Sequence, residues 1–242
     1  MDLMRYKFDN WIYAYDLETT GMYGIPVIQP ERVEVADYMW TDFRNVGLWR
    51  KPGEESKKWG IHFFIQDYRF GCVYNRLNTY TDSLRRVGVV CSPDFSMYTD
   101  YPDALSIYSH YRKHVVAAFW QRNGLKVIPS ICWTDRHSHA WCFDGEPVGG
   151  TVAIANTVLP SNKEAYKNFK YGFDAMMERL EPYQILWYGR RRSDCEGPIV
   201  GIPSFCDQRW RKRTSDLTQV QYFDLQEYRK KQEEQKTQED DT

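Results

Sequence analysis

Short apolar segments alternate with longer amphipathic segments along most of this chain, and this alternation limits the folds open to it. β-branched and aromatic residues predict strands at 11–15, 24–30, 61–65, 87–91, 126–133, 151–155, 184–189 and 199–203. Apolar residues three or four positions apart predict helices at 74–84, 102–122 and 161–180, the last begun by a capping box from Ser161 to Glu164. Strands separated by helices pair in parallel through right-handed crossovers, so the sequence predicts an α/β fold with mainly parallel strands.

The number of strand–helix units narrows this class further. Six or seven units favour a (β/α)-barrel-like arrangement, complete or incomplete, with a doubly wound open sheet as the second choice. The 242 residues suffice for one such domain, which we expect at 1–223. Within it, the segment 31–60 carries Pro52-Gly53 and a run of charges and is predicted to be an irregular insertion. The charged, glutamine-rich segment 224–242 is predicted to be a disordered tail.

The charge and composition argue against several classes of protein. A net charge of −1 gives no general attraction to nucleic acid or to an anionic membrane. No apolar run reaches the roughly 18 residues that cross a bilayer, and the N-terminal segment lacks the apolar stretch of a signal peptide. We therefore expect a cytoplasmic protein without a membrane partner. The six cysteines contain no Cys-x-x-Cys pair, which argues against a zinc ribbon or knuckle.

Three carboxylates follow predicted strands within a few residues. Asp67, Asp94 and Asp135 would converge where the carboxyl ends of parallel strands meet, in a layout suited to acid–base catalysis or to a bound magnesium ion. Asp and Asn after strands are also ordinary helix caps and turn residues, and that alternative stays open. Other polar and aromatic side chains at the strand ends are predicted to bind a ligand, the aromatic ones by stacking on a base or sugar: Ser92, Ser96, Tyr98, Asp100, Trp133, Asn156 and Tyr188.

Basic residues are concentrated after the strand at 184–189 and around Trp210. They are Arg190, Arg191, Arg192, Arg209, Arg211, Lys212 and Arg213. Loops after the late strands of barrels often hold phosphate, and arginine forks suit phosphate oxygens. The cluster therefore predicts a site for a phosphorylated small molecule or for a nucleic-acid backbone, with a charged surface loop as the alternative.

One N-terminal motif suggests a metal-dependent nuclease. The segment 16–21, Asp-Leu-Glu-Thr-Thr-Gly, matches letter for letter the first motif of proofreading-type 3′–5′ exonucleases, in which two carboxylates hold catalytic metal. The later residues of such a site have no counterpart here, because Tyr171 precedes Asp174 at the wrong spacing. The alternative is a strand that ends in a Thr-Gly turn.

The histidines offer two weaker metal motifs. His137-Ser138-His139 resembles the His-hydrophobe-His motif of rolling-circle nucleases, but its middle residue is serine and the segment is predicted to be a loop. His110 and His114 are one helical turn apart, as in a two-histidine metal site, but no Glu follows His110. The helix face also carries a lysine and a tyrosine, so we expect a solvent-facing pair.

Several segments together resemble one family. The segment 62–70 looks like its HF-x-x-D-D-x-x-F segment, with Gln66-Asp67 where members often have Asp-Asp. Residues 92–102 look like its SPDFS-x-Y-x-D-x-P signature, and 124–129, 142–145 and 186–189 follow in the family's order and spacing. The family is an uncharacterised domain-of-unknown-function group of bacteria, mobile elements and bacteriophages, and the resemblance covers about residues 24–210. It implies a phage or mobile-element context, hence a host cytoplasm, and no established activity.

Three functions remain open from the sequence. The first is an enzyme acting on a phosphorylated nucleotide or a nucleic-acid end, with Asp67, Asp94 and Asp135 as acid–base or metal groups and the arginines after Gly189 on phosphate. The second is a binding module that sequesters a ligand or blocks a host protein without turnover. The third is a metal-dependent 3′–5′ exonuclease that uses Asp16 and Glu18. The oligomeric state is left open.

Overall fold

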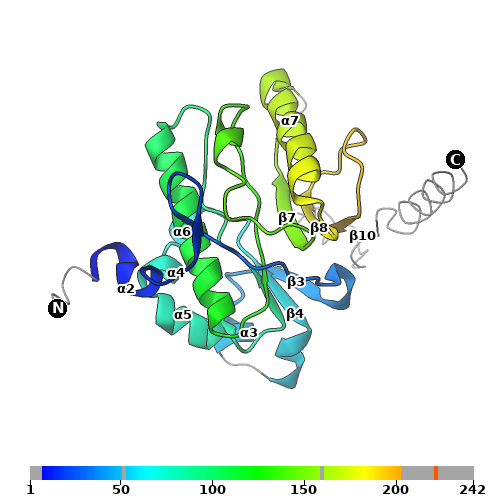
Figure 1. Ribbon diagram of the computed structural model, residues 1–242. Helices are drawn as coiled ribbons and strands as arrows, with labels where there is room; N and C mark the ends of the chain where they lie inside the picture. Colours follow the sequence, from blue (N-terminus) through cyan, green and yellow to red (C-terminus); the bar gives the residue numbers. More distant parts are fainter. Residues whose placement is uncertain (1–6, 51–52, 159–160, 203–220, 223–242) are drawn as a thin grey trace, which may run out of the picture.

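Two four-stranded sheets form the frame of the protein in a computed structural model that describes residues 7–50, 53–158, 161–202 and 221–222 (Figure 1). The first sheet joins β3 (Met39–Asp42), β4 (Trp59–His62), β5 (Val89–Cys91) and β6 (Val127–Ile128), all parallel and in sequence order. The second joins β7 (Thr151–Asn156), β8 (Gln184–Gly189) and β9 (Ile199–Ile202) in parallel, with β10 (Gln221–Tyr222) antiparallel to β9. The predicted α/β class with mainly parallel strands is confirmed.

A short parallel bridge connects the two sheets. Ser130, just beyond β6, pairs with Ala153 of β7. The Ala153 N–H donates to the Pro129 carbonyl oxygen at 2.8 Å, and the Ile131 N–H donates to the Ala153 carbonyl oxygen at 2.8 Å. The described strands therefore follow one another from β3 to β9 without the reversal of order that a doubly wound sheet contains. Closure into a barrel stays a prediction.

Helices cover the outer faces of this succession of strands. Figure 1 shows α2 (Trp11–Ala14) at one flank near α4 (Cys72–Asn75) and α6 (Asp103–Arg122), and α7 (Lys163–Leu180) at the other flank beside β7. The predicted helix at 74–84 is divided, because Arg76, with φ −134°, separates α4 from α5 (Leu77–Leu84). The remaining short elements are α3 (Val46–Arg50), the strands β1 (Thr19–Thr20) and β2 (Ile25–Pro26), and the 3-10 turns Phe8–Asn10, Val35–Asp37, Glu54–Lys58, Asp67–Arg69 and Ser138–Ala140.

The strands predicted at 24–30, 61–65 and 126–133 are found only in part, as β2, β4 and β6, and three other local predictions also differ from the structure. The apolar segment 11–15, predicted to be a strand, contains helix α2, because a short apolar run has no decisive periodicity and here packs on α6 through Tyr13 and Phe119, 5.1 Å between ring centroids. The segment 31–60, predicted to be irregular, contains the edge strand β3 and helix α3. The capping box at Ser161 is wrong by one residue, since the Asn162 side chain caps α7 by accepting from the Ala165 N–H at 3.1 Å.

Three groups of buried side chains hold these layers together. The first lies between the first sheet and α6 and includes Phe63 and Trp120; the second lies between the second sheet and α7 and includes Trp187. The third draws alternate residues from the strands of both sheets, namely Val89, Cys91, Ile128, Ala153, Leu186, Tyr188, Val200 and Ile202. Full burial of a Val, Leu, Ile or Phe side chain contributes about 1.5–3 kcal/mol. The shared group keeps the carboxyl ends of β5, β6 and β7 near one another.

Among the residues described, no helix is both long and apolar enough to cross a membrane. The predicted tail at 224–242 lies outside the described residues, as does the basic group of Arg209, Arg211, Lys212 and Arg213 around Trp210.

Candidate functional site

A cavity of about 450 Å³ opens at the carboxyl ends of three neighbouring parallel strands. Its walls are residues from the segments 94–99 after β5, 131–134 after β6, 155–158 at the end of β7, and 162–169 in the first turns of α7. Ligands of α/β proteins commonly bind outside the carboxyl ends of parallel strands, because the following loops converge there. Asp94, Ser96, Tyr98 and Trp133 are the predicted site residues that line this cavity.

The Asp94 carboxyl group, in the cavity wall, has a raised pKa. Its Oδ1 accepts a hydrogen bond from the Cys132 thiol at 2.6 Å. Burial raises the pKa of Asp94 to about 6, although the Cys132 hydrogen bond and the positive charge of Lys113 act in the opposite direction. The negative charge of Asp67 adds to the increase in pKa. Asp94 can therefore exchange a proton near neutral pH.

Asp67 holds the loop that carries Asp94. Its two carboxylate oxygens accept from the Ser96 backbone N–H at 3.0 Å and from the Ser96 hydroxyl at 2.7 Å. Ser92 plays a similar part deeper in the fold, since its hydroxyl accepts from the Ser130 N–H and its carbonyl oxygen accepts from the Ser130 hydroxyl, both at 2.8 Å. Both residues fix the geometry of the segments on which the cavity is built.

Of the three predicted aspartates only Asp94 lines the cavity, and Asp135 lies outside its wall. Its Oδ1 accepts from the backbone N–H groups of His137 at 2.9 Å and of Ser138 at 3.4 Å, as in an Asx turn. His137 itself pairs with Asp103 at 3.1 Å, whereas His139 packs against Phe143. The two imidazoles of the 137–139 segment therefore have different partners.

The remaining predicted ligand-binding residues are divided between the rim and the interior. Tyr98 is exposed and lies edge-on to Tyr101, with 4.9 Å between ring centroids, and Asp100 is exposed in the same loop. Asn156 is buried and donates from its amide to the Arg190 carbonyl oxygen at 2.8 Å. Tyr188 is buried between His62 and Phe64, with ring centroids 4.9 and 5.0 Å away.

The three arginines after β8 lie outside the cavity wall, and the side chains of Arg191 and Arg192 have intramolecular partners. The Arg192 guanidinium forms a pair of hydrogen bonds to Asp194, at 2.9 and 2.6 Å, and donates to the Tyr166 carbonyl oxygen at 2.6 Å. It also lies 3.3 Å from the centroid of the Tyr166 ring. Arg191 donates to the Arg192 carbonyl oxygen and lies over Trp187, and the side chain of Arg190 is exposed.

A buried ionic group lies behind the cavity and was not anticipated from the sequence. Lys113 donates to the Glu146 Oε1 at 2.5 Å and to the Ser130 carbonyl oxygen at 2.9 Å. Burial alone would lower the pKa of Lys113, but the charge of Glu146 raises it above its ordinary value. Burial likewise opposes ionisation of Glu146, yet Lys113 and His114 hold its pKa below the ordinary value. The two groups therefore form a buried ion pair.

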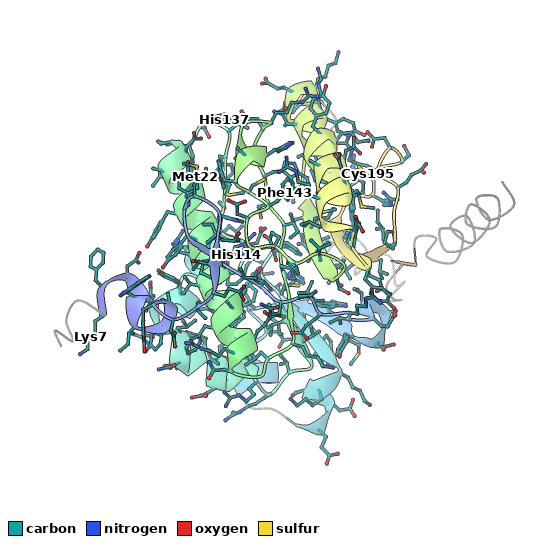
Figure 2. The ribbon with its side chains drawn as sticks, in the orientation of Figure 1. Lys7, Met22, His114, His137, Phe143 and Cys195 are labelled. Carbon is teal, nitrogen blue, oxygen red and sulfur yellow. The ribbon has the colours of Figure 1, made fainter. Side chains whose placement is uncertain are left out.

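The prediction that His110 and His114 face solvent is wrong. Their exposed fractions are 1% and 0%, and Figure 2 shows His114 inside the body of the molecule, with His137 at its edge. The reason is that α6 is covered on a second side, where the Pro26 carbonyl oxygen lies 2.7 Å from His114 Nδ1 and the Asp144 carbonyl oxygen lies 3.0 Å from His110 Nε2. The nearly uninterrupted apolar run that follows His114, from Val115 to Trp120, was the available signal for such burial.

Asp16, the first carboxylate of the exonuclease motif, lies at the end of α6 opposite to Asp103. The Asp16 carboxylate pairs with Arg122, the last residue of α6, at 2.6 Å, while Asp103, the first residue, pairs with His137. A helix of 20 residues is about 30 Å long. Within the described part of the chain, one group of three or more His, Cys, Asp or Glu side chains is placed to share a metal ion. It consists of His110, His114 and Glu146, and it does not contain Asp16 or Glu18.

A substitution at Gly172 of α7 would test how tightly the cavity wall is packed. A Cβ atom at this position would lie 2.2 Å from the Trp133 Nε1, so Gly172→Ala must displace the indole. We expect a net loss of about 1–2 kcal/mol in the free energy of unfolding, because overpacking outweighs the gain of about 1 kcal/mol in helix propensity. Urea denaturation measures the loss, and adding Trp133→Phe should restore most of it. A stabilised Gly172→Ala variant would contradict this packing.

The comparisons with known proteins identify the family but no activity. Residues 17–205 match the family model described as "Domain of unknown function (DUF4417)". The chain is 33% identical over 219 residues to the "Gene 1 protein" of Mycobacterium phage L5, covering 87% of this chain and 91% of that protein. It is 32% identical over 217 residues to the "Gene 1 protein" of Mycobacterium phage D29, covering 87% of this chain and 77% of that protein. No solved structure matches the chain. The resemblance to a domain-of-unknown-function family with phage members is therefore confirmed, and the chain belongs to the DUF4417 family.

Proposed function

We propose that the protein is an enzyme that binds a nucleotide or a nucleic-acid end in the cavity at the carboxyl ends of β5, β6 and β7, with Asp94 as its acid–base group. The observation that carries the proposal is Asp94 itself. A carboxyl group whose pKa is raised to about 6 by burial, in a cavity wall at strand ends, is suited to transfer a proton near neutral pH. At neutral pH such a buried, ionised carboxylate stabilises the folded chain less than an uncharged side chain would. Its presence in the cavity wall therefore favours a chemical role.

The cavity wall supports a ligand with a flat ring and polar groups. Its volume of about 450 Å³ falls within the range of small-molecule sites, roughly 300–1,000 Å³. Trp133, Tyr98 and Phe169 offer aromatic surface on which a base could stack. The first turn of the 18-residue helix α7 also lines the cavity, and backbone N–H groups at a helix start favour a phosphate.

The neighbours of Asp94 have positioning roles in this proposal. Burial raises the pKa of Cys132 well above its ordinary value, so Cys132 is a neutral thiol that orients the Asp94 carboxylate as a hydrogen-bond donor. Asp67 orients the loop through Ser96. Magnesium remains part of the proposal as an ion that a phosphorylated ligand would bring to these carboxylates.

The experiment is a binding and turnover panel on the full chain. Nucleosides, nucleoside 5′-monophosphates and short 5′-phosphorylated oligonucleotides, with and without magnesium, are tested by the shift in melting temperature and by chromatography of the products. We expect one class to raise the melting temperature and to be converted. Asp94→Asn should keep the shift and lower turnover by about 10²–10⁴-fold, while Asp82→Asn, exposed on α5 and not part of the cavity wall, should change neither. A wild-type chain that responds to no member of the panel would contradict the proposal.

A binding module without turnover is the second candidate, in the same cavity or at the surface. Large apolar side chains are exposed near the N-terminus of the described chain, among them Phe8 at 80% and Met22 at 85%, and exposed apolar surface favours binding of a partner protein. In the panel this candidate predicts a shift in melting temperature without product. In either case we propose that the protein acts in the cytoplasm of a host cell.

A further inference from the structure

The hydrogen bonds of His110 and His114 determine which ring nitrogens carry protons. His110 Nε2 lies 3.0 Å from the Asp144 carbonyl oxygen, and His114 Nδ1 lies 2.7 Å from the Pro26 carbonyl oxygen. A carbonyl oxygen only accepts hydrogen bonds, so both of these nitrogens are N–H donors. In a neutral imidazole the second nitrogen then carries a lone pair, which assigns lone pairs to His110 Nδ1 and His114 Nε2.

The His114 lone pair lies beside a carboxylate, and no donor among the described residues satisfies the His110 lone pair. His114 Nε2 lies 3.1 Å from the Glu146 Oε1, although both atoms are acceptors. His110 Nδ1 and the Glu146 Oε2 are buried and have no hydrogen-bond partner among the described residues. Of the two Glu146 carboxylate oxygens, Lys113 donates to Oε1. Buried acceptors left unpaired cost about 1–3 kcal/mol each, and a cation bound among them would offset that cost.

We propose that His110, His114 and Glu146 bind a divalent transition-metal ion, with zinc as the best fit. One donor atom from each residue lies within 4.8 Å of the other two. The 3.1 Å between His114 Nε2 and Glu146 Oε1 is close to the edge of about 3.3 Å expected between two ligands of a tetrahedral zinc. Imidazole nitrogens favour zinc and its neighbours in the transition series, whereas magnesium favours oxygen ligands.

The surroundings of the three side chains match those of a metal centre. Each histidine donates its other N–H to a backbone carbonyl, the outer-shell arrangement that fixes the ring of a metal ligand. Gly145 lets the segment 144–146 approach α6, because a Cβ there would lie 2.9 Å from His114 Nδ1 and 2.6 Å from the Pro26 carbonyl oxygen. The acceptor for the His110 N–H, the close approach and the carboxylate ligand thus come from three consecutive residues.

The position of the site indicates a structural role for the ion. The exposed fractions of His110, His114 and Glu146 are 1%, 0% and 8%, and none of them lines the cavity. A metal here would join α6 to the segment 144–146, whose Gly145 carbonyl oxygen accepts from the Ile28 N–H just after β2. The competing explanation is a second proton on His114, which would let Nε2 donate to Glu146 without any metal.

Zinc binding to the full chain tests the site. The purified protein is treated with a chelator, then titrated with zinc by calorimetry and with cobalt by absorption spectroscopy. We expect one equivalent to bind, a tetrahedral cobalt spectrum and a higher melting temperature. His110→Gln should weaken binding by more than about 100-fold, beyond the effect of losing an outer partner. His137→Gln removes an exposed histidine and should bind as wild type does.

Two results would overturn the proposal. One is a chelator-treated wild-type chain that is folded by circular dichroism and binds neither zinc nor cobalt. The other is His110→Gln that binds one equivalent as tightly as wild type. Because Glu146→Gln also removes the negative charge that offsets the buried Lys113, its folding is checked separately, and His110→Gln carries the decision. Neither result bears on nucleotide binding in the cavity, so the two proposals fail independently.

Discussion

The Asp94→Asn variant is expected to be more stable than the wild-type chain at pH 7.5, by about 2–3 kcal/mol. Burial raises the pKa of Asp94 to about 6, whereas an Asp in the unfolded chain titrates near 3.9. Between these values the folded state binds more protons than the unfolded state, so its stability falls as the pH rises. An amide has nearly the same shape and carries no charge, so asparagine avoids this loss.

Urea denaturation at pH 4.5 and at pH 7.5 measures this effect. We expect the difference in free energy of unfolding between Asp94→Asn and wild type to be small at pH 4.5 and larger by about 2 kcal/mol at pH 7.5. Asp100→Asn, exposed in the same loop, should show no such change. If Asp94→Asn is less stable than wild type at both pH values, then Asp94 is a structural cap and the proposed acid–base role is wrong.

Lys113→Met is expected to lower the free energy of unfolding by about 3–5 kcal/mol. The side chains of Lys113 and Glu146 are 2% and 0% exposed, and Lys113 is also bonded to the Ser130 carbonyl oxygen. Removing one member of such a pair leaves an uncompensated charge in the interior. Methionine keeps most of the volume, so the loss reports the charge rather than a cavity.

A double-mutant cycle separates the ion pair from its surroundings. Lys113→Met combined with Glu146→Met should cost much less than the sum of the two single changes, because no charge is left buried. Lys170→Met is the control, since its pair with Asp174 is partly exposed and should contribute less than about 1 kcal/mol. All samples contain chelator, so that metal binding does not enter the comparison. A loss below 1 kcal/mol for Lys113→Met would contradict a buried pair.

The longer elements could be predicted from the sequence because their periodicity is strong. The helix predicted at 102–122 and the strands at 151–155 and 184–189 agree with α6, β7 and β8 to within one residue. The segment 11–15 could not, because a short apolar run fits a strand and a helix equally well. Strand β3 could not be predicted either, because its partly exposed residues lack the apolar alternation of a strand. Its pairing with β4 is what holds these residues in a sheet.

The candidate site, too, could be predicted only in part from the sequence. The sequence alone determined the α/β class, the family and the location of Asp94 after a buried strand, because these depend on local pattern and on neighbours in the chain. Only the tertiary structure decided that Asp67 fixes the Asp94 loop, that Asp135 closes a turn, and that His110, Lys113 and His114 lie in the interior beside Glu146. Whether a polar side chain contacts water, another side chain or a metal depends on residues far away in sequence. For His110 and His114 these are the segments around Asp144 and Pro26. The periodicity of α6 itself carries no information about those segments.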